Sequence, residues 1–155
     1  MENVLNVAAH IANRYLLEYG NQIDEMKLHK LMYFAQRESM IQTGEPLFDA
    51  TFYGWKYGPV LKEIRNAFRD GSFAMMKPSE LEKDCSGIFD RIFHDYAGKD
   101  SWSLSRLTHG ELSWKNSRIG IDEDANSDNK MDLEDIRRDA ERIKARREML
   151  AGILG

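Results

Sequence analysis

The chain has 155 residues, a formal net charge of −4 and a single cysteine, Cys85. This length predicts one domain with a sizeable hydrophobic core, and the mild acidity argues against broad binding to nucleic-acid phosphates. One cysteine excludes an intramolecular disulfide and fits a reducing compartment, where Cys85 is expected to be an unreactive thiol. Neither a long apolar run nor a basic leader follows Met1, so we expect a cytoplasmic protein without a membrane segment.

Two long helices are predicted at the start of the chain. Apolar residues recur at helical spacing from Val4 to Tyr19, and Gly20 can take the left-handed conformation that ends a helix. Asp24 is placed to cap a second helix, which Gly44 ends. Apolar residues surround most of this second helix, so we expect it to be the central and most buried one.

A short β element is expected next, near residues 50–57. Aromatic and β-branched residues alternate there with a period of two, which is typical of a strand. Pro59 suits the first position of a helix that carries its apolar face to Phe68 and ends at Gly71. Residues 72–77 are predicted to form a second strand that pairs with the first.

The rest of the chain is predicted to be helical, apart from one acidic linker. Helices are expected over residues 88–96, 104–108 and 112–119, and the last one over Leu133–Leu150. The apolar stripe of the last helix is narrow, so this helix should pack by an edge or against a partner.

These elements predict a mainly α protein, with six or seven helices in a single compact domain and a minor β element. We expect residues 1–119 to form the main domain, residues 120–131 an acidic linker, and residues 132–155 a C-terminal helix that packs on the domain or on a partner.

Groups suited to catalysis are sparse. None of the four histidines (His10, His29, His94 and His109) has a second one three or four residues away, as a helical metal site would require. The sequence has no phosphate-binding loop and no nucleophile-elbow motif. We therefore predict no catalytic, cofactor-binding or metal-binding residue. His109 could act as a general base with Thr108 or Glu111 nearby, but a histidine that caps a helix end is the favoured interpretation.

Oxygen-bearing side chains in residues 124–135 follow the ligand spacing of a calcium-binding EF-hand loop. Asn129 stands at the sixth position, where glycine is the rule, and Asp135 replaces the longer glutamate of the twelfth. The favoured interpretation is a solvated acidic linker in which Asp132 caps the last helix.

Three aromatic residues, Trp55, Tyr57 and Trp114, each combine a large apolar ring with one polar tip. Such side chains suit both a buried core and a protein interface. The sequence leaves open which of these roles each of them has.

Three segments share their order and approximate spacing with a known family. They are residues 27–36 (KLHKLMYFAQ), 52–60 (FYGWKYGPV) and 104–114 (LSRLTHGELSW). From about residue 5 to residue 119 the chain resembles the Panacea domain family, which includes SocA-like antitoxins and phage-associated GepA-like proteins. His29 and Ser113 depart from the family pattern, which has glutamine and proline at these places.

The resemblance implies an antitoxin-like protein that neutralises a cognate protein toxin by direct contact, without catalysis. It also implies a second function, that of a proteolytic adaptor that delivers the toxin to a ClpXP-type protease. A DNA-binding autoregulator, which the acidity disfavours, and a hydrolase that uses His109 both stay open. A homodimer is an option for the last helix. The candidate partner-binding residues are Trp55, Tyr57, Gly58, Pro59, Thr108, His109, Trp114, Arg146 and Arg147.

Overall fold

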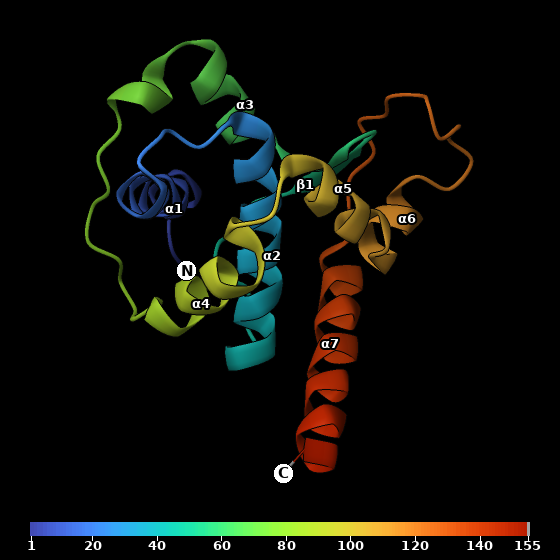
Figure 1. Cartoon of the computed structure of the whole chain (residues 1–155). Helices are drawn as coiled ribbons and strands as arrows, with labels where there is room; N and C mark the ends of the chain where they lie inside the picture. Colours follow the sequence, from blue (N-terminus) through green and yellow to red (C-terminus); the bar gives the residue numbers. More distant parts are fainter. Residues whose placement is uncertain (155) are drawn as a thin grey trace.

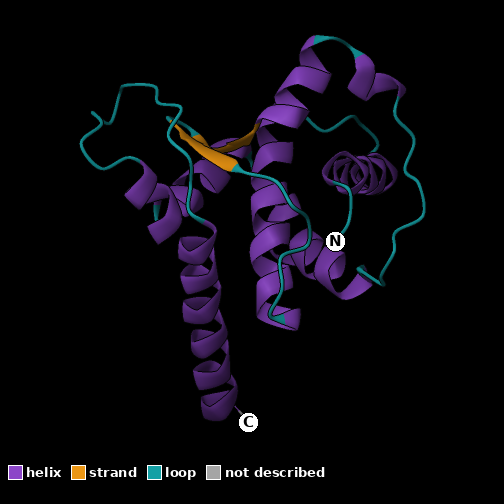
Figure 2. Cartoon of the chain, turned by 180° about the vertical axis from the view of Figure 1, so that it is seen from behind, coloured by secondary structure: helices purple, strands orange, loops and turns teal. Residues whose placement is uncertain are grey.

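The computed structural model describes residues 1–154, which form a mainly helical domain with one small β-hairpin (Figures 1 and 2). The expected fold class is therefore confirmed. The elements are α1 (Val4–Tyr19), α2 (Glu25–Thr43), β1 (Phe52–Trp55), β2 (Gly58–Leu61), α3 (Lys62–Arg69), the 3-10 helix η1 (Ser72–Met75), α4 (Ser86–Ile92), the π-helical turn η2 (Phe93–Ala97), α5 (Ser101–His109), α6 (Leu112–Ser117) and α7 (Leu133–Leu154).

Helix α2 is the centre of the fold, as its apolar circumference predicts. Every residue from Lys27 to Ile41 is buried, and α1, α3, α4, α5 and α7 all contact this helix. Figure 1 shows α2 running through the middle of the molecule, with α1 seen end-on beside it. Because α2 lies in the core, its polar side chains must find partners inside the protein.

The predicted helix signals at the start of the chain are confirmed. Gly20 and Gly44 end α1 and α2 at a φ of 78°, and the Asp24 carboxylate accepts a hydrogen bond from the backbone N–H of Lys27. Local capping chemistry therefore fixes both ends of the central helix.

The two predictions made for the region after β1 are wrong. Residues 72–77 form no strand, and the strand that pairs with β1 is β2, in which Pro59 stands opposite Gly54. Helix α3 consequently begins at Lys62, three residues after Pro59. Lys56 and Tyr57 alone form the turn of the antiparallel hairpin, which places Tyr57 at its tip.

The acidic linker returns to the hairpin. The Asn129 carbonyl accepts from the Gly54 N–H at 2.9 Å, and the Met131 N–H donates to the Phe52 carbonyl at 2.8 Å. Lys130 forms an isolated antiparallel bridge with Tyr53. The linker therefore lies along the side of β1 that β2 does not occupy.

The first half of helix α7 packs on the domain through buried apolar residues. Ile136 and Ala140 are buried, and α7 contacts α2 and α6. Its last turns run past the rest of the molecule in both views (Figures 1 and 2), and Met149, Leu150, Ile153 and Leu154 are exposed there. The helix continues to Leu154, beyond the predicted end at Leu150.

Candidate functional site

Two aromatic rings stand at the surface around the tip of the hairpin. Tyr57 is 45% exposed and Trp102, in the first turn of α5, is 66% exposed. Their ring centroids are 6.4 Å apart, with the ring planes inclined at 53°. Exposed tryptophan is unusual in a monomer, and paired surface aromatics are typical of protein interfaces. We call Tyr57 and Trp102, together with the half-buried Trp55 of the hairpin, the aromatic surface.

A pocket of about 450 Å³ adjoins this surface. Trp55, Lys56 and Tyr57 of the hairpin line one part of it, and Glu25 and Met26 at the start of α2 line another. The half-buried Trp55 donates its indole N–H to Asp128 at 2.9 Å, so the linker fixes the orientation of this ring. A hydrogen bond thus holds one aromatic wall of the pocket, Trp55, in place.

Three of the predicted partner-binding residues are buried beneath the hairpin tip. Gly58 and Pro59 lie in β2, and the Thr108 hydroxyl donates to the Ser105 carbonyl at 2.9 Å. Gly58 has a φ of +129°, and a Cβ atom there would lie 2.9 Å from Thr108 Oγ1. These residues shape the turn that presents Tyr57, and their own side chains are covered.

Trp114 attaches α6 to the hairpin by a hydrogen bond. It is 9% exposed, and its indole N–H donates to the Trp55 carbonyl at 2.9 Å. The His109 ring stacks on it with the centroids 4.0 Å apart. Trp114 is therefore a core aromatic, whereas Tyr57 is a surface one.

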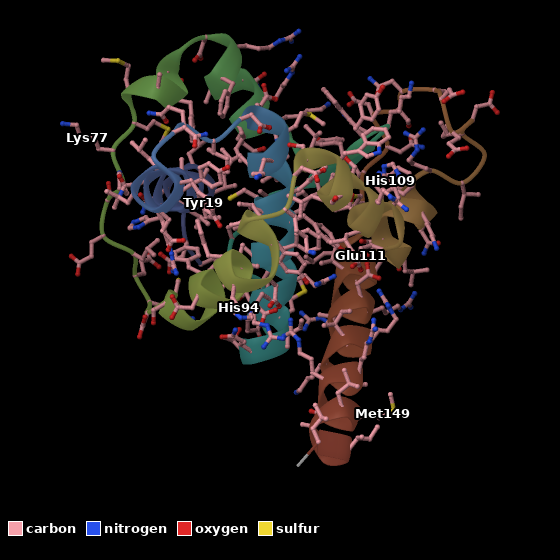
Figure 3. All side chains as sticks on the ribbon, viewed as in Figure 1. Tyr19, Lys77, His94, His109, Glu111 and Met149 are labelled. Carbon is pink, nitrogen blue, oxygen red and sulfur yellow. The ribbon has the colours of Figure 1, made fainter. Side chains whose placement is uncertain are left out.

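His109 is poorly placed to act as a catalytic base in the described chain. Burial and the nearby Lys30 ammonium lower the pKa of His109, and its Nε2 is buried with no hydrogen-bond partner among residues 1–154. No hydrogen bond joins it to Thr108, and Glu111 pairs with Arg37 instead. Figure 3 shows His109 and Glu111 at the join between α5 and α6. His109 therefore lacks an orienting carboxylate.

Glu111 belongs to a buried polar cluster between α2, α6 and α7. One carboxylate oxygen accepts from Arg37 Nη1, and Arg37 Nη2 donates to the Tyr96 hydroxyl at 2.6 Å. Asp139 of α7 accepts from the backbone N–H groups of Leu112 and Ser113 at 2.8 and 3.0 Å. Asp139 thereby binds the first N–H groups of α6, which have no partner within that helix.

The two arginines predicted near the end of α7 have different surroundings. Arg147 forms a bidentate ion pair with the buried Glu38 of α2, at 2.9 and 3.0 Å. Arg146 is exposed and forms no ion pair within residues 1–154. Arg147 therefore attaches α7 to α2, while Arg146 is free to meet another molecule.

Three acidic side chains of residues 124–135, those of Asp128, Asp132 and Asp135, accept hydrogen bonds from protein groups. Asp128 accepts from Lys62 Nζ at 2.7 Å as well as from Trp55, and Asp135 accepts from Asn116 at 3.1 Å. The Asp132 carboxylate accepts from the Glu134 N–H at 2.7 Å, as expected of a cap for α7. Within residues 1–154 no three His, Cys, Asp or Glu side chains are grouped to hold a metal ion.

Two residues at or beneath the aromatic surface are absent from the set predicted from the sequence: Trp102, and Lys30, which is buried next to Gly58. Trp102 was identifiable: it lies four residues before Arg106 on a helix whose Leu104, Ser105 and Thr108 face inward. Lys30 was hidden inside an apolar run. Burial lowers its pKa to about 8, and the one hydrogen bond of its side chain within residues 1–154, to the Met26 carbonyl, is long at 3.5 Å.

These features define a small helical protein with a hairpin held between α2, α5 and α6. Residues 28–115 match the family described as Antitoxin SocA-like, Panacea domain, so the chain belongs to this family. The match covers most of α2 and runs into α6, and it leaves out α1 and α7.

One curated relative is the antitoxin SocA of Caulobacter vibrioides (strain NA1000 / CB15N). It is 26% identical over 98 residues, which is 58% of this chain and 52% of that protein. The chain thus spans about half the length of this relative. No solved structure matches the chain. No helix within residues 1–154 is both long and apolar enough to cross a bilayer.

Proposed function

We propose that this chain is an antitoxin that binds a protein toxin directly and blocks it by occupying the toxin's surface. Membership of the antitoxin SocA-like family and the similarity to a SocA antitoxin support this proposal. The observation that carries it is the pair of exposed rings, Tyr57 and Trp102, beside the 450 Å³ pocket. Buried tryptophan and tyrosine rings supply much of the binding energy in protein interfaces.

Blocking a toxin by covering its surface requires tight binding and no catalysis. A toxin present at low concentration must be held at about nanomolar Kd, which corresponds to about −12 kcal/mol. A standard interface reaches this value only if a few well-packed anchors are desolvated. Tyr57 and Trp102 are such anchors, because the turn at Gly58 and the first turn of α5 fix their backbones.

The test measures binding of the protein encoded by the adjacent gene, by calorimetry, together with rescue of growth when both are expressed. We expect Trp102→Ala and Tyr57→Ala each to weaken binding by about tenfold to a hundredfold, as truncated anchors do. Both side chains are exposed, so the melting temperature should change little. Met75→Ala is the matched control: Met75 is 83% exposed and lies in η1. Failure of the adjacent-gene product to bind the wild type would end the proposal.

A second candidate is an adaptor that presents the toxin to a ClpXP-type protease. The exposed apolar residues in the last turns of α7 favour it, because they provide a surface separate from the aromatic one. An adaptor shortens the toxin's lifetime in cells that contain the protease, and Leu150→Asp should then lengthen it without weakening binding. If the toxin has the same lifetime in cells with and without the protease, the adaptor function is excluded and blocking by binding remains.

A further inference from the structure

A second pocket, of about 310 Å³, is lined by arginines from three helices. Arg37 comes from α2, Arg106 from α5, and Arg142 and Arg146 from α7. Glu111 is the one carboxylate among the lining residues, and Figure 3 shows it at the start of α7. We call this site the arginine pocket. It shares no lining residue with the pocket beside the aromatic surface.

The arginine at the base of the pocket is fixed. Arg37 is 2% exposed, pairs with Glu111 and Tyr96, and holds its guanidinium carbon 4.9 Å from the Phe34 ring centroid. Its Nε is buried without a hydrogen-bond partner among the described residues. One N–H donor at the base of the pocket is therefore unsatisfied, although Glu111 and Glu38 both act on the Arg37 charge.

The arginines at the rim are available. Arg106 and Arg146 are exposed, and neither forms an ion pair within residues 1–154. Arg142 reaches Glu111 only at 3.4 Å. A guanidinium group binds carboxylates through two parallel N–H donors, so the rim offers several sets of donors to one incoming anion.

The surroundings indicate which anion fits. Leu107 and Ile143 add apolar walls, and the Phe34 and Tyr96 rings stack with their centroids 3.9 Å apart. A pocket of this volume holds one or two side chains, whereas a nucleic-acid backbone needs a continuous basic groove, which is unexpected on a chain of net charge −4. The combination of charge and apolar walls favours a protein segment.

We propose that the arginine pocket receives an acidic side chain, next to an apolar one, from the protein that this chain binds. The inference rests on the proposed function and adds the chemistry of the partner's docking segment. Arg106 and Arg146 are the binding residues, and Arg37 closes the base of the pocket.

The first experiment uses the purified full chain and a fluorescein-labelled peptide of ten alternating leucine and glutamate residues. Anisotropy near 0.15 M salt should show micromolar binding, and a matched leucine–glutamine peptide should bind at least about tenfold more weakly. The double variant R106E/R146E should lose at least about tenfold in affinity for the glutamate peptide. Its matched control is K115E/K144E, which changes the net charge equally at two exposed lysines that do not line the pocket.

Four results would overturn the inference. They are no binding of the glutamate peptide up to about 1 mM, equal binding of the two peptides, equal loss in the control variant, and tighter binding of a ten-nucleotide single-stranded DNA. The last result would assign the arginines to nucleic acid.

The adjacent-gene product separates this inference from the proposed function. If it binds the wild type and R106E/R146E equally but loses affinity for Trp102→Ala, the proposed function stands and the pocket assignment fails. If it does not bind at all while the glutamate peptide binds in a pocket-dependent way, the proposed partner fails and the chemistry of the pocket stands.

Discussion

Glu111 is a carboxyl group that folding removes from water and places between a guanidinium and a second carboxylate. Burial is the largest effect and raises the pKa of Glu111 to about 7; the charge of Asp139 adds to the rise, and the charge of Arg37 opposes it. The groups that face it are Arg37 and Tyr33 of α2, and Asp139 and Arg142 of α7. Glu111 therefore changes charge near neutral pH.

This shift predicts a pH-dependent stability. Between pH 4.5 and about 7 the folded chain holds a proton on Glu111 that the unfolded chain releases, so the free energy of unfolding falls as pH rises through this window. The full effect is about 3 kcal/mol at most. Urea unfolding at pH 5, 6, 7 and 8 should show the stability advantage of the wild type over Glu111→Gln shrinking as pH rises. A constant difference between the two proteins would contradict the assignment.

The role of a single residue could be predicted from the sequence only where its partners are close to it in the chain. Gly20, Asp24 and Gly44 act through their own backbone or through a neighbour three residues away, so their roles could be predicted. The partners of Arg37 and Asp139 lie far away in the sequence, and nothing local signals that a charge will be buried there. For Arg146 and Arg147, adjacent in sequence and equal in chemistry, only the packing of α7 on α2 distinguishes the free residue from the paired one.

Arg147 attaches the second half of α7 through its ion pair with Glu38 and a longer one, at 3.9 Å, with Asp95. Arg147→Ala would leave the buried Glu38 without its cation, and the cost should be about 1–3 kcal/mol of unfolding free energy. Amide hydrogen exchange over residues 148–154 should also become faster, because α7 loses this ion pair with α2. Arg146→Ala is the matched control and should change stability by less than about 0.5 kcal/mol. Equal effects of the two changes would refute this role of Arg147.

Strand β2 of the hairpin was predicted to be the start of a helix, and its structure explains why this prediction was wrong. Its turn, Lys56-Tyr57, lacks the Asn-Gly or Asp-Gly signal of a tight hairpin, and Pro59 seemed better suited to start a helix. Opposite Gly54, Pro59 occupies a position whose N–H would point away from β1, so the sheet loses no hydrogen bond. The next outward N–H, that of Leu61, donates to His29 Nδ1 at 3.2 Å. The prediction of a helix that starts at Pro59 was wrong because the group that satisfies the outer N–H of β2, His29 of α2, is remote in the sequence.

At the scale of the molecule, the hairpin, α6 and α7 are joined to α2 by buried hydrogen bonds. Tyr33 of α2 donates to Asp139 of α7 and is hydrogen-bonded to Ser113 of α6. The Leu61 N–H of the hairpin donates to His29 of α2. The core is one cluster that extends from α1 to α7. These links predict that the chain unfolds as a single cooperative unit.

Two probes can check this prediction. The three tryptophans lie in the hairpin, α5 and α6, whereas far-ultraviolet circular dichroism reports all the helices. Their urea transitions should coincide within error. A fluorescence transition at lower urea than the dichroism transition would mean that the hairpin side opens before α1 and α4.

The matched family region and the proposed partner surfaces do not coincide. Residues 28–115 include the aromatic surface and Arg106 but exclude α7, which contributes Arg142 and Arg146. A partner that reaches both pockets would contact the family domain and its C-terminal helix together. The order and type of most elements could be predicted from local patterns. That α7 and the family domain line one pocket together could not, because it depends on how α7 packs.

The return of residues 129–131 to β1 affects more than the linker. A two-stranded hairpin normally offers both of its sides for annealing with strands of other chains, which is how many proteins form fibres or amorphous aggregates. Here Asn129 and Met131 occupy the hydrogen-bonding groups on one side, and the other side is buried, with a proline and a histidine-capped amide. Neither edge of the hairpin is therefore open to a strand of another chain, so edge-to-edge annealing is blocked without a charged or shortened strand.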